Sequence, residues 1–153
     1  LPKEIDSRSK RILLLTDEQR VDHLFEAGRT LFNRGKYFDA HEEWEEMWSE
    51  FNLPDHLFVQ GLIQVTVSFY HLETGNLQGS KNLMGRAIDK LTKRGPNAGR
   101  WNSSQRGINS ALFIEKIERC ARVINRIDNP ADFDWNLVPQ LQSVEKNRRQ
   151  AQL

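Results

Sequence analysis

A histidine and a glutamate one helical turn apart form the spacing in this sequence that is best suited to chemistry. They belong to the string His41-Glu42-Glu43-Trp44-Glu45, inside a segment whose apolar residues recur at helical spacing. In the H-E-x-x-H pattern two side chains at this spacing bind one zinc ion, and here Glu45 stands in the second position. The same pair also suits acid–base work, because a histidine that is oriented by a carboxylate titrates near neutral pH.

A second set of polar side chains shares one side of the helix expected over residues 55–73. That helix is apolar on nearly every other side, which is typical of the central helix of a bundle. Since successive helical residues rotate by about 100°, one narrow arc holds the polar residues Gln60, Gln64, Ser68 and His71. Buried amides need hydrogen-bond partners, which we expect on the inner face of the preceding helix. The sequence therefore predicts a polar cluster in or beside the core, formed by His41, Glu45, Gln60, Gln64 and His71.

Three interpretations of this cluster stay open. The first is a hydrogen-bonded network that fixes the register of the helices. The second is a metal or small-ligand site, in which His41, Glu45 and His71 would supply the two histidines and one carboxylate that suit zinc, iron or manganese. The third is a catalytic acid–base pair of His41 and Glu45. The cofactor is thus unknown from the sequence, and a divalent metal is the candidate.

Cationic and aromatic residues gather in the loop expected over residues 94–107. They have the character of a surface that binds phosphate groups or single-stranded nucleic acid: Arg94, Arg100, Trp101 and Arg106. With Arg148 and Arg149, they make residues 94–153 the candidate surface for a protein partner or an anionic ligand, with nucleic acid as the weaker alternative. A plain solvated loop is the simpler interpretation.

The single cysteine, Cys120, lies at the centre of an apolar helical stripe. This position predicts an inert core thiol rather than a nucleophile, and one cysteine excludes an internal disulfide and a thiolate zinc cluster. His23 and His56 fall near helix starts or turns and are expected at the surface.

Apolar spacing is helical along most of the chain, and no alternating strand stands out. The first helix follows a capping box at Thr16–Gln19 and ends near Gly35, and the next four are expected at about 37–51, 55–73, 77–93 and 108–127. One short helix and a basic tail follow. These elements predict an all-α, single-domain bundle of about five to six helices with a central buried helix. The expected divisions are an N-terminal extension (1–15), the bundle domain (16–127) and a C-terminal extension (128–153).

The length and composition are typical of a globular domain with one hydrophobic core. Of the 153 residues, 38% are hydrophobic and 28% are charged. The net charge of +1 conceals an asymmetry, because residues 1–80 carry 8 basic and 14 acidic side chains, whereas residues 81–153 carry 14 basic and 7 acidic ones. The longest apolar runs, such as Ile12–Leu15, are far too short to cross a bilayer, so we expect no membrane insertion.

Two segments resemble the signatures of the domain-of-unknown-function family 309, small all-helical proteins of bacteria, archaea and plastids. The first is Phe32–Trp48 (FNRGKYFDAHEEWEEMW), and the second is Gln60–Gln64 (QGLIQ) with His71, Gly75-Asn76, Gly79 and Leu83 after it. The resemblance covers about residues 20–92 and implies an all-α bundle, but no established activity, substrate or cofactor. Its signature positions fall on a candidate binding set of His41, Glu42, Glu45, Trp48, Gln60, Gln64 and His71.

The sequence thus leads to a non-enzymatic binding or interaction module built around the His/Glu/Gln cluster. The alternative is a metal-dependent or acid–base enzyme, such as a hydrolase, that uses His41, Glu45 and His71. Residues 1–10 contain no apolar segment of the kind found in secretory signals, and the expected location is the cytoplasm or the plastid stroma.

Overall fold

The computed structural model describes residues 6–7, 14–93 and 105–144 of the chain. Five α-helices make up most of this part: α2 (Asp17–Asn33), α3 (Tyr37–Glu50), α4 (His56–Glu73), α5 (Leu77–Lys93) and α6 (Ser110–Ile124). Three short 3-10 helices accompany them: η1 (Gln105–Gly107), η2 (Pro130–Asp132) and η3 (Trp135–Leu137). In the described ranges the only β-type pairing is one isolated bridge between Ile108 and Ser143. The predicted all-α bundle is confirmed.

Local sequence signals set the ends of the first helices. Thr16 Oγ1 accepts the backbone N–H of Gln19 at 3.2 Å, and Gln19 Oε1 accepts that of Thr16 at 3.0 Å, so the capping box forms as predicted. After α2 and α4 the chain turns at Gly35 (φ +74°) and Gly75 (φ +90°), where a side chain would be strained. These signals are why the expected helices over residues 17–93 agree closely with the observed ones.

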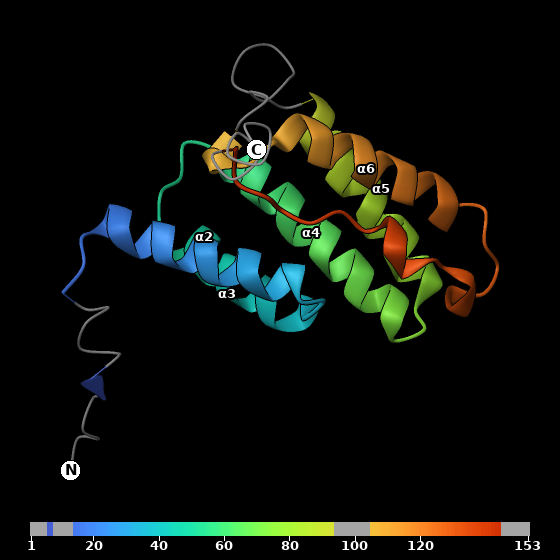
Figure 1. Cartoon of the computed structure of the whole chain (residues 1–153), viewed down its shortest axis with the longest axis horizontal. Coiled ribbons are helices and arrows are strands. Elements are labelled where there is room, and N and C mark those ends of the chain that lie inside the picture. Colours follow the sequence, from blue (N-terminus) through green and yellow to red (C-terminus); the bar gives the residue numbers. More distant parts are fainter. Residues whose placement is uncertain (1–5, 8–13, 94–104, 145–153) are drawn as a thin grey trace, which may run out of the picture.

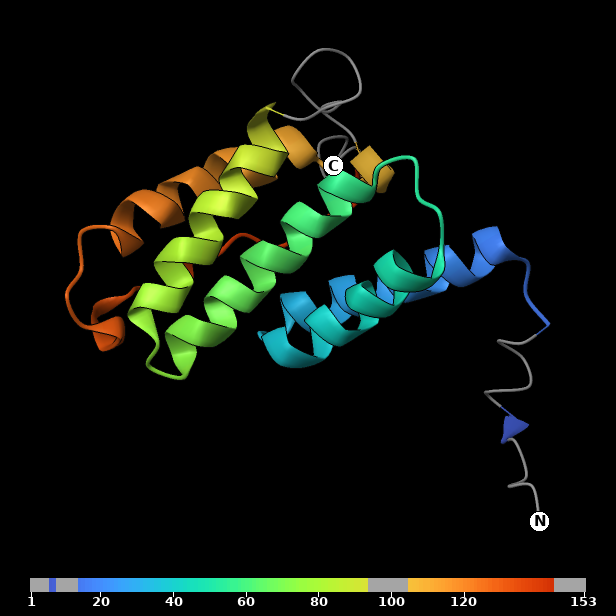
Figure 2. The same cartoon turned by 180° about the vertical axis from the view of Figure 1, so that it is seen from behind.

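The helices form two hairpins and a covering helix, as Figures 1 and 2 show from opposite sides. α2 packs on α3, α4 packs on both α3 and α5, and α6 packs on α5. α4 is therefore the central helix, as predicted. It buries residues on nearly every side: Phe58, Val59, Gly61, Leu62, Ile63, Val65, Thr66, Ser68, Phe69 and Leu72.

Aromatic rings join the two hairpins at the core. The ring of Phe32 on α2 lies 5.5 Å from that of Tyr37, 6.0 Å from Trp44, 6.3 Å from Phe69 and 5.9 Å from Phe113, measured between centroids. These partners come from α3, α4 and α6, so the side chain of Phe32 joins α2 to three other helices. Aromatic contacts at these separations add to the free energy gained by burying the rings.

The chain after α6 differs from its prediction. α6 ends at Ile124 rather than near residue 127, and the single short helix expected beyond it is replaced by η2 and η3. Pro130 starts η2 without a backbone N–H, and Pro139 follows η3, so neither turn extends into an α-helix.

Residues 138–142, here called the strap, run back between α2 and α6 (Figure 1, red). The backbone N–H of Leu141 donates to Asn33 Oδ1 at 2.7 Å, and its carbonyl accepts from Arg29 Nη1 at 3.0 Å. Leu141 is buried, as is Phe133 before the strap. The part of the chain after residue 128 thus contributes side chains to the bundle's core.

Candidate functional site

Four of the seven candidate binding residues line one surface groove, here called the Glu45 groove. Glu45 and Trp48 reach it from α3, and Gln60 and Gln64 reach it from successive turns of α4. The groove has a volume of about 210 Å³. The spacing in the sequence predicted that these residues share faces of their helices, and the hairpin of α3 and α4 brings the two faces together.

Apolar side chains form the rest of the groove. They are Ile63 and Val67 of α4 and Leu83 of α5. These residues were not predicted as part of the site, although Ile63 and Val67 each lie one helical turn after a glutamine of the cluster, Gln60 and Gln64 respectively. Leu83 belongs to α5, and no pattern in the sequence indicates that this helix reaches the cluster.

The polar groups of the groove differ in whether they already have partners. Glu45 is exposed, and its carboxylate makes no hydrogen bond or ion pair with any residue that the structure describes. The side-chain amide of half-buried Gln60 is likewise unpaired within the described ranges. The Oε1 atom of Gln64 accepts a hydrogen bond of 2.9 Å from Lys90 Nζ on α5. The groove therefore presents one unpaired carboxylate and one unpaired amide to solvent.

Trp48 is held in place by its indole group. Its Nε1–H donates to the carbonyl oxygen of His56 at 3.0 Å, across the turn between α3 and α4. The ring is half-buried and packs against the core, so it forms a fixed aromatic wall of the groove.

The two histidines of the predicted cluster have local partners instead. His41 Nδ1 lies 2.8 Å from the carbonyl oxygen of Phe38 and donates to it, so this atom is not oriented by Glu45. His71 Nδ1 accepts from Asn76 Nδ2 at 3.2 Å, just past the end of α4. Both rings are half-buried and lie outside the residues that line the groove. Glu42 is exposed and does not line it either.

This geometry bears on the proposed metal and catalytic roles. Among the residues described, no three His, Cys, Asp or Glu side chains are grouped so that they could hold one metal ion. His41, Glu45 and His71 thus do not form the predicted ligand set, since each histidine nitrogen named above bonds to its own helix or to the turn that follows it. Nothing in the described structure favours the enzyme alternative.

The expectation that α3 supplies the partners of the polar arc on α4 is wrong. Ser68 Oγ donates to the carbonyl oxygen of Ser80 at 2.8 Å and lies 2.9 Å from Ser80 Oγ, and Ser80 belongs to α5. Gln64 also bonds to α5, through Lys90. α4 turns this arc toward α5, so the helix that follows it satisfies the buried hydroxyl.

The predicted cationic surface also needs a correction. Arg106 Nε and Nη2 each lie 2.6 Å from a carboxylate oxygen of Asp55, and the side chains of Arg106 and Asp55 are only 15% and 8% exposed. The guanidinium also lies 5.6 Å from the centroid of the Phe25 ring. Arg106 is therefore part of an internal ion pair and not of an anion-binding surface, because buried Asp55 requires a cation. Arg94, Arg100 and Trp101 lie outside the described residues.

Cys120 is fully buried, as predicted. Its thiol donates to the carbonyl oxygen of Leu137 at 3.5 Å, and burial raises the pKa of the thiol to about 11. Burial likewise raises the pKa of Tyr37 to about 12, with smaller contributions from Glu73 and Cys120. A thiol with such a pKa stays protonated near neutral pH and is a poor nucleophile. His23 and His56 are exposed, as expected.

The fold and the groove together define a small all-α protein of packed helical hairpins. Residues 25–83 match the model of a family described as Domain of unknown function (DUF309). The match spans α3 and α4, the second half of α2 and the start of α5, so it includes every residue that lines the Glu45 groove. It confirms the resemblance seen in the sequence and leaves the function unknown.

Searches of curated proteins and of solved structures found no match to the chain. In the part of the chain that the structure describes, every helix is too short or too polar to span a bilayer.

Proposed function

We propose that this protein is a non-enzymatic interaction module whose Glu45 groove receives one basic side chain of a partner protein. The observation that carries the proposal is the unpaired carboxylate of Glu45 at a groove whose other lining residues are uncharged. A carboxylate in such a place attracts a cation, and the amide oxygen of Gln60 adds a second acceptor.

The size of the groove favours a single side chain. Its volume of about 210 Å³ is below the roughly 300–1,000 Å³ of sites that enclose drug-sized ligands. Lysine and arginine combine a long apolar stem with a charged head. Ile63, Val67 and Leu83 offer an apolar surface for the stem, while Glu45 offers a counter-ion for the head. The Trp48 ring adds an aromatic wall, to which cations are also attracted.

The charge of the surrounding helix supports a basic partner. α3 contains six acidic residues and no lysine or arginine: Asp39, Glu42, Glu43, Glu45, Glu46 and Glu50. Their electric field would raise the local concentration of a cationic segment and increase its association rate. It would also favour cationic partners over neutral or acidic ones.

Binding of model side chains tests the proposal directly. We expect Nα-acetyl-lysine methylamide, which keeps the side-chain ammonium, to shift the NMR signals of Glu45, Gln60 and the Trp48 indole. Its arginine counterpart should do the same. The norleucine counterpart has a similar stem without the charge, and we expect it to bind at least about fivefold more weakly. Glu45→Gln should weaken lysine binding by about five- to tenfold. The control Glu46→Gln removes one charge from the same helix outside the groove and should change affinity less than about twofold.

Two results would contradict this function. One is equal binding of the lysine and norleucine compounds, which would mean that charge plays no part. The other is an equal loss of affinity in Glu45→Gln and Glu46→Gln, which would assign the effect to the general field of α3 rather than to the groove.

A further inference from the structure

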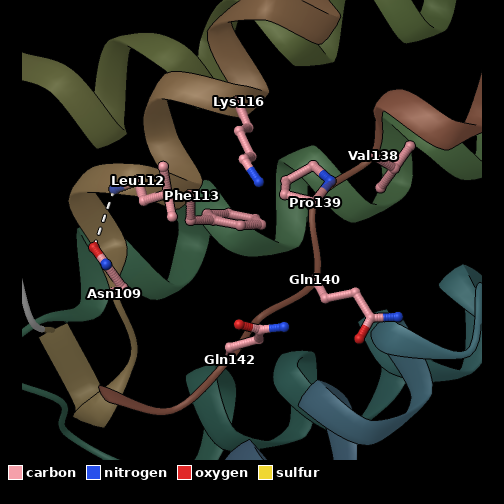
Figure 3. Close-up of a pocket in the computed structure, with 8 residues that line it drawn as sticks. All are labelled: Asn109, Leu112, Phe113, Lys116, Val138, Pro139, Gln140 and Gln142. Carbon is pink, nitrogen blue, oxygen red and sulfur yellow. Dashed lines mark hydrogen bonds between the residues drawn. The ribbon is translucent and has the colours of Figure 1, made fainter. Parts of the chain in front are cut away.

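The geometry points to a second binding site, for a small carboxylate with an apolar body, in a cavity between α6 and the strap (Figure 3). The cavity has a volume of about 260 Å³ and lies beside the first two turns of α6. It shares no lining residue with the Glu45 groove, so this inference does not depend on the function proposed above.

One cation lines the cavity. Lys116 extends from α6 toward the space that Phe113 and Pro139 also line (Figure 3). Lys116 is the single charged residue among those that line the cavity, and its amine has no hydrogen bond or ion pair with any described residue. An ammonium group in this position is available to an anionic ligand.

The cavity also contains an amide that is not otherwise used. The side chain of Gln142 belongs to the strap and lines the cavity (Figure 3), and it has no hydrogen-bond partner within the described ranges. Gln142 is held from its backbone instead, since its carbonyl oxygen accepts from the N–H of Asn109 at 3.4 Å. Its side-chain NH₂ group can therefore donate to an acceptor that enters the cavity.

Apolar groups make up the remaining walls. Leu112 is 43% exposed, which is unusual for a large hydrophobic residue of this protein, and it borders the cavity together with Phe113, Val138 and Pro139. A ligand that covers these side chains would bury apolar surface at the same time as its head group meets Lys116.

These features select a carboxylate over other anions. One ammonium balances one negative charge, whereas phosphate groups are more often recognised by several cations or by the paired donors of arginine. The volume suits a small body such as one aromatic ring. Free carboxylates and the C-terminal residue of a peptide share this chemistry.

The test uses phenylacetate and its neutral counterpart phenylacetamide, titrated into the full chain and followed by the backbone NMR signals of Leu112, Phe113 and Gln142. We expect phenylacetate to bind about tenfold more tightly than phenylacetamide. Lys116→Met keeps the stem and removes the charge, and it should abolish this preference. The control Lys81→Met removes a positive charge from α5, away from the cavity, and should leave the preference within about twofold of the unmodified chain.

A peptide ending in phenylalanine, with a free or an amidated C-terminus, separates the two sources of the carboxylate. Tighter binding of the free-acid peptide than of phenylacetate would assign the site to peptide C-termini, and weaker binding would assign it to free carboxylates; both outcomes support the site. Equal affinity for phenylacetate and phenylacetamide, or an unchanged preference in Lys116→Met, would overturn it.

Discussion

Arg106 holds the carboxylate of Asp55 through two hydrogen bonds of 2.6 Å, although the two residues lie 51 positions apart in the sequence. Gln105 Nε2 donates to the same carboxylate at 3.1 Å. Arg106 adopts a φ of 52°, a left-handed conformation that costs a residue other than glycine roughly 1–2 kcal/mol. The ion pair thus attaches the turn before α6 to the turn between α3 and α4, and it offsets the strain in the backbone of Arg106.

Two substitutions of Arg106 should separate the effect of the ion pair on stability from the effect of the backbone strain. Arg106→Ala leaves buried Asp55 without its cation, and we expect the free energy of unfolding to fall by about 3–5 kcal/mol. Arg106→Gly loses the same ion pair but adopts the left-handed conformation readily, so it should be less destabilised than Arg106→Ala by about 1 kcal/mol. Urea denaturation measures both values.

Arg126→Ala serves as the matched control, because Arg126 is exposed and should matter by less than about 0.5 kcal/mol. If Arg106→Ala were no more destabilising than this control, the ion pair would have no structural role. Equal stability of the alanine and glycine variants would remove the argument from backbone strain.

The ends of the first helices could be predicted from the sequence, whereas this ion pair could not. The ends of α2 and α4 depend on signals within a few residues, such as the capping box at Thr16 and the glycines at positions 35 and 75. The partnership of Asp55 with Arg106 has no local signal, since each residue lies in a turn where a charged side chain is normally solvated. It follows from the tertiary packing of segments that are distant in sequence.

The candidate site was predictable to a similar extent. Helical periodicity shows which residues share a face, so Gln60 and Gln64 were placed together correctly. It does not show which neighbouring helix that face meets, and Ser68 therefore bonds to Ser80 of α5 rather than to α3. The strap was missed because η2, η3 and the extended residues after them have no repeating apolar pattern that a single sequence reveals.

Stability should depend on pH in the alkaline range because of Cys120. Burial raises the pKa of its thiol from 9.0 to about 11, so the folded state holds this proton more tightly than the unfolded state does. The resulting stabilisation is complete below pH 9 and is lost as the pH rises from about 9 to 11, a fall of about 2–3 kcal/mol. Urea denaturation at a series of pH values should show this fall.

Cys120→Ala identifies the group responsible for the slope. The variant has a lower stability at neutral pH because of the small cavity it creates, but its stability should change less between pH 9 and 11 than that of the unmodified chain. The pKa of Tyr37 is also raised, from 10.0 to about 12. Its ionisation therefore lowers the free energy of unfolding at higher pH, and it does so equally in both proteins. An identical slope between pH 9 and 11 in the two proteins would show that Cys120 is not the source.

Gly28 is required by the position of Trp44, and this relationship gives a last prediction. A Cβ atom on Gly28 would lie 2.2 Å from Trp44 Nε1, while that indole is fully buried and donates to the carbonyl oxygen of Phe25 at 3.1 Å. We expect Gly28→Ala to displace the ring, weaken this hydrogen bond and lower the free energy of unfolding by about 2–4 kcal/mol. Gly85→Ala is the control, because a Cβ on this helical glycine meets no atom within 4 Å and should stabilise α5 by about 0.5–1 kcal/mol. Thermal or urea unfolding should therefore show a lower free energy of unfolding for Gly28→Ala and a higher one for Gly85→Ala. If Gly28→Ala were as stable as the unmodified chain, α2 and α3 would accommodate the extra methyl group and Gly28 would not be required.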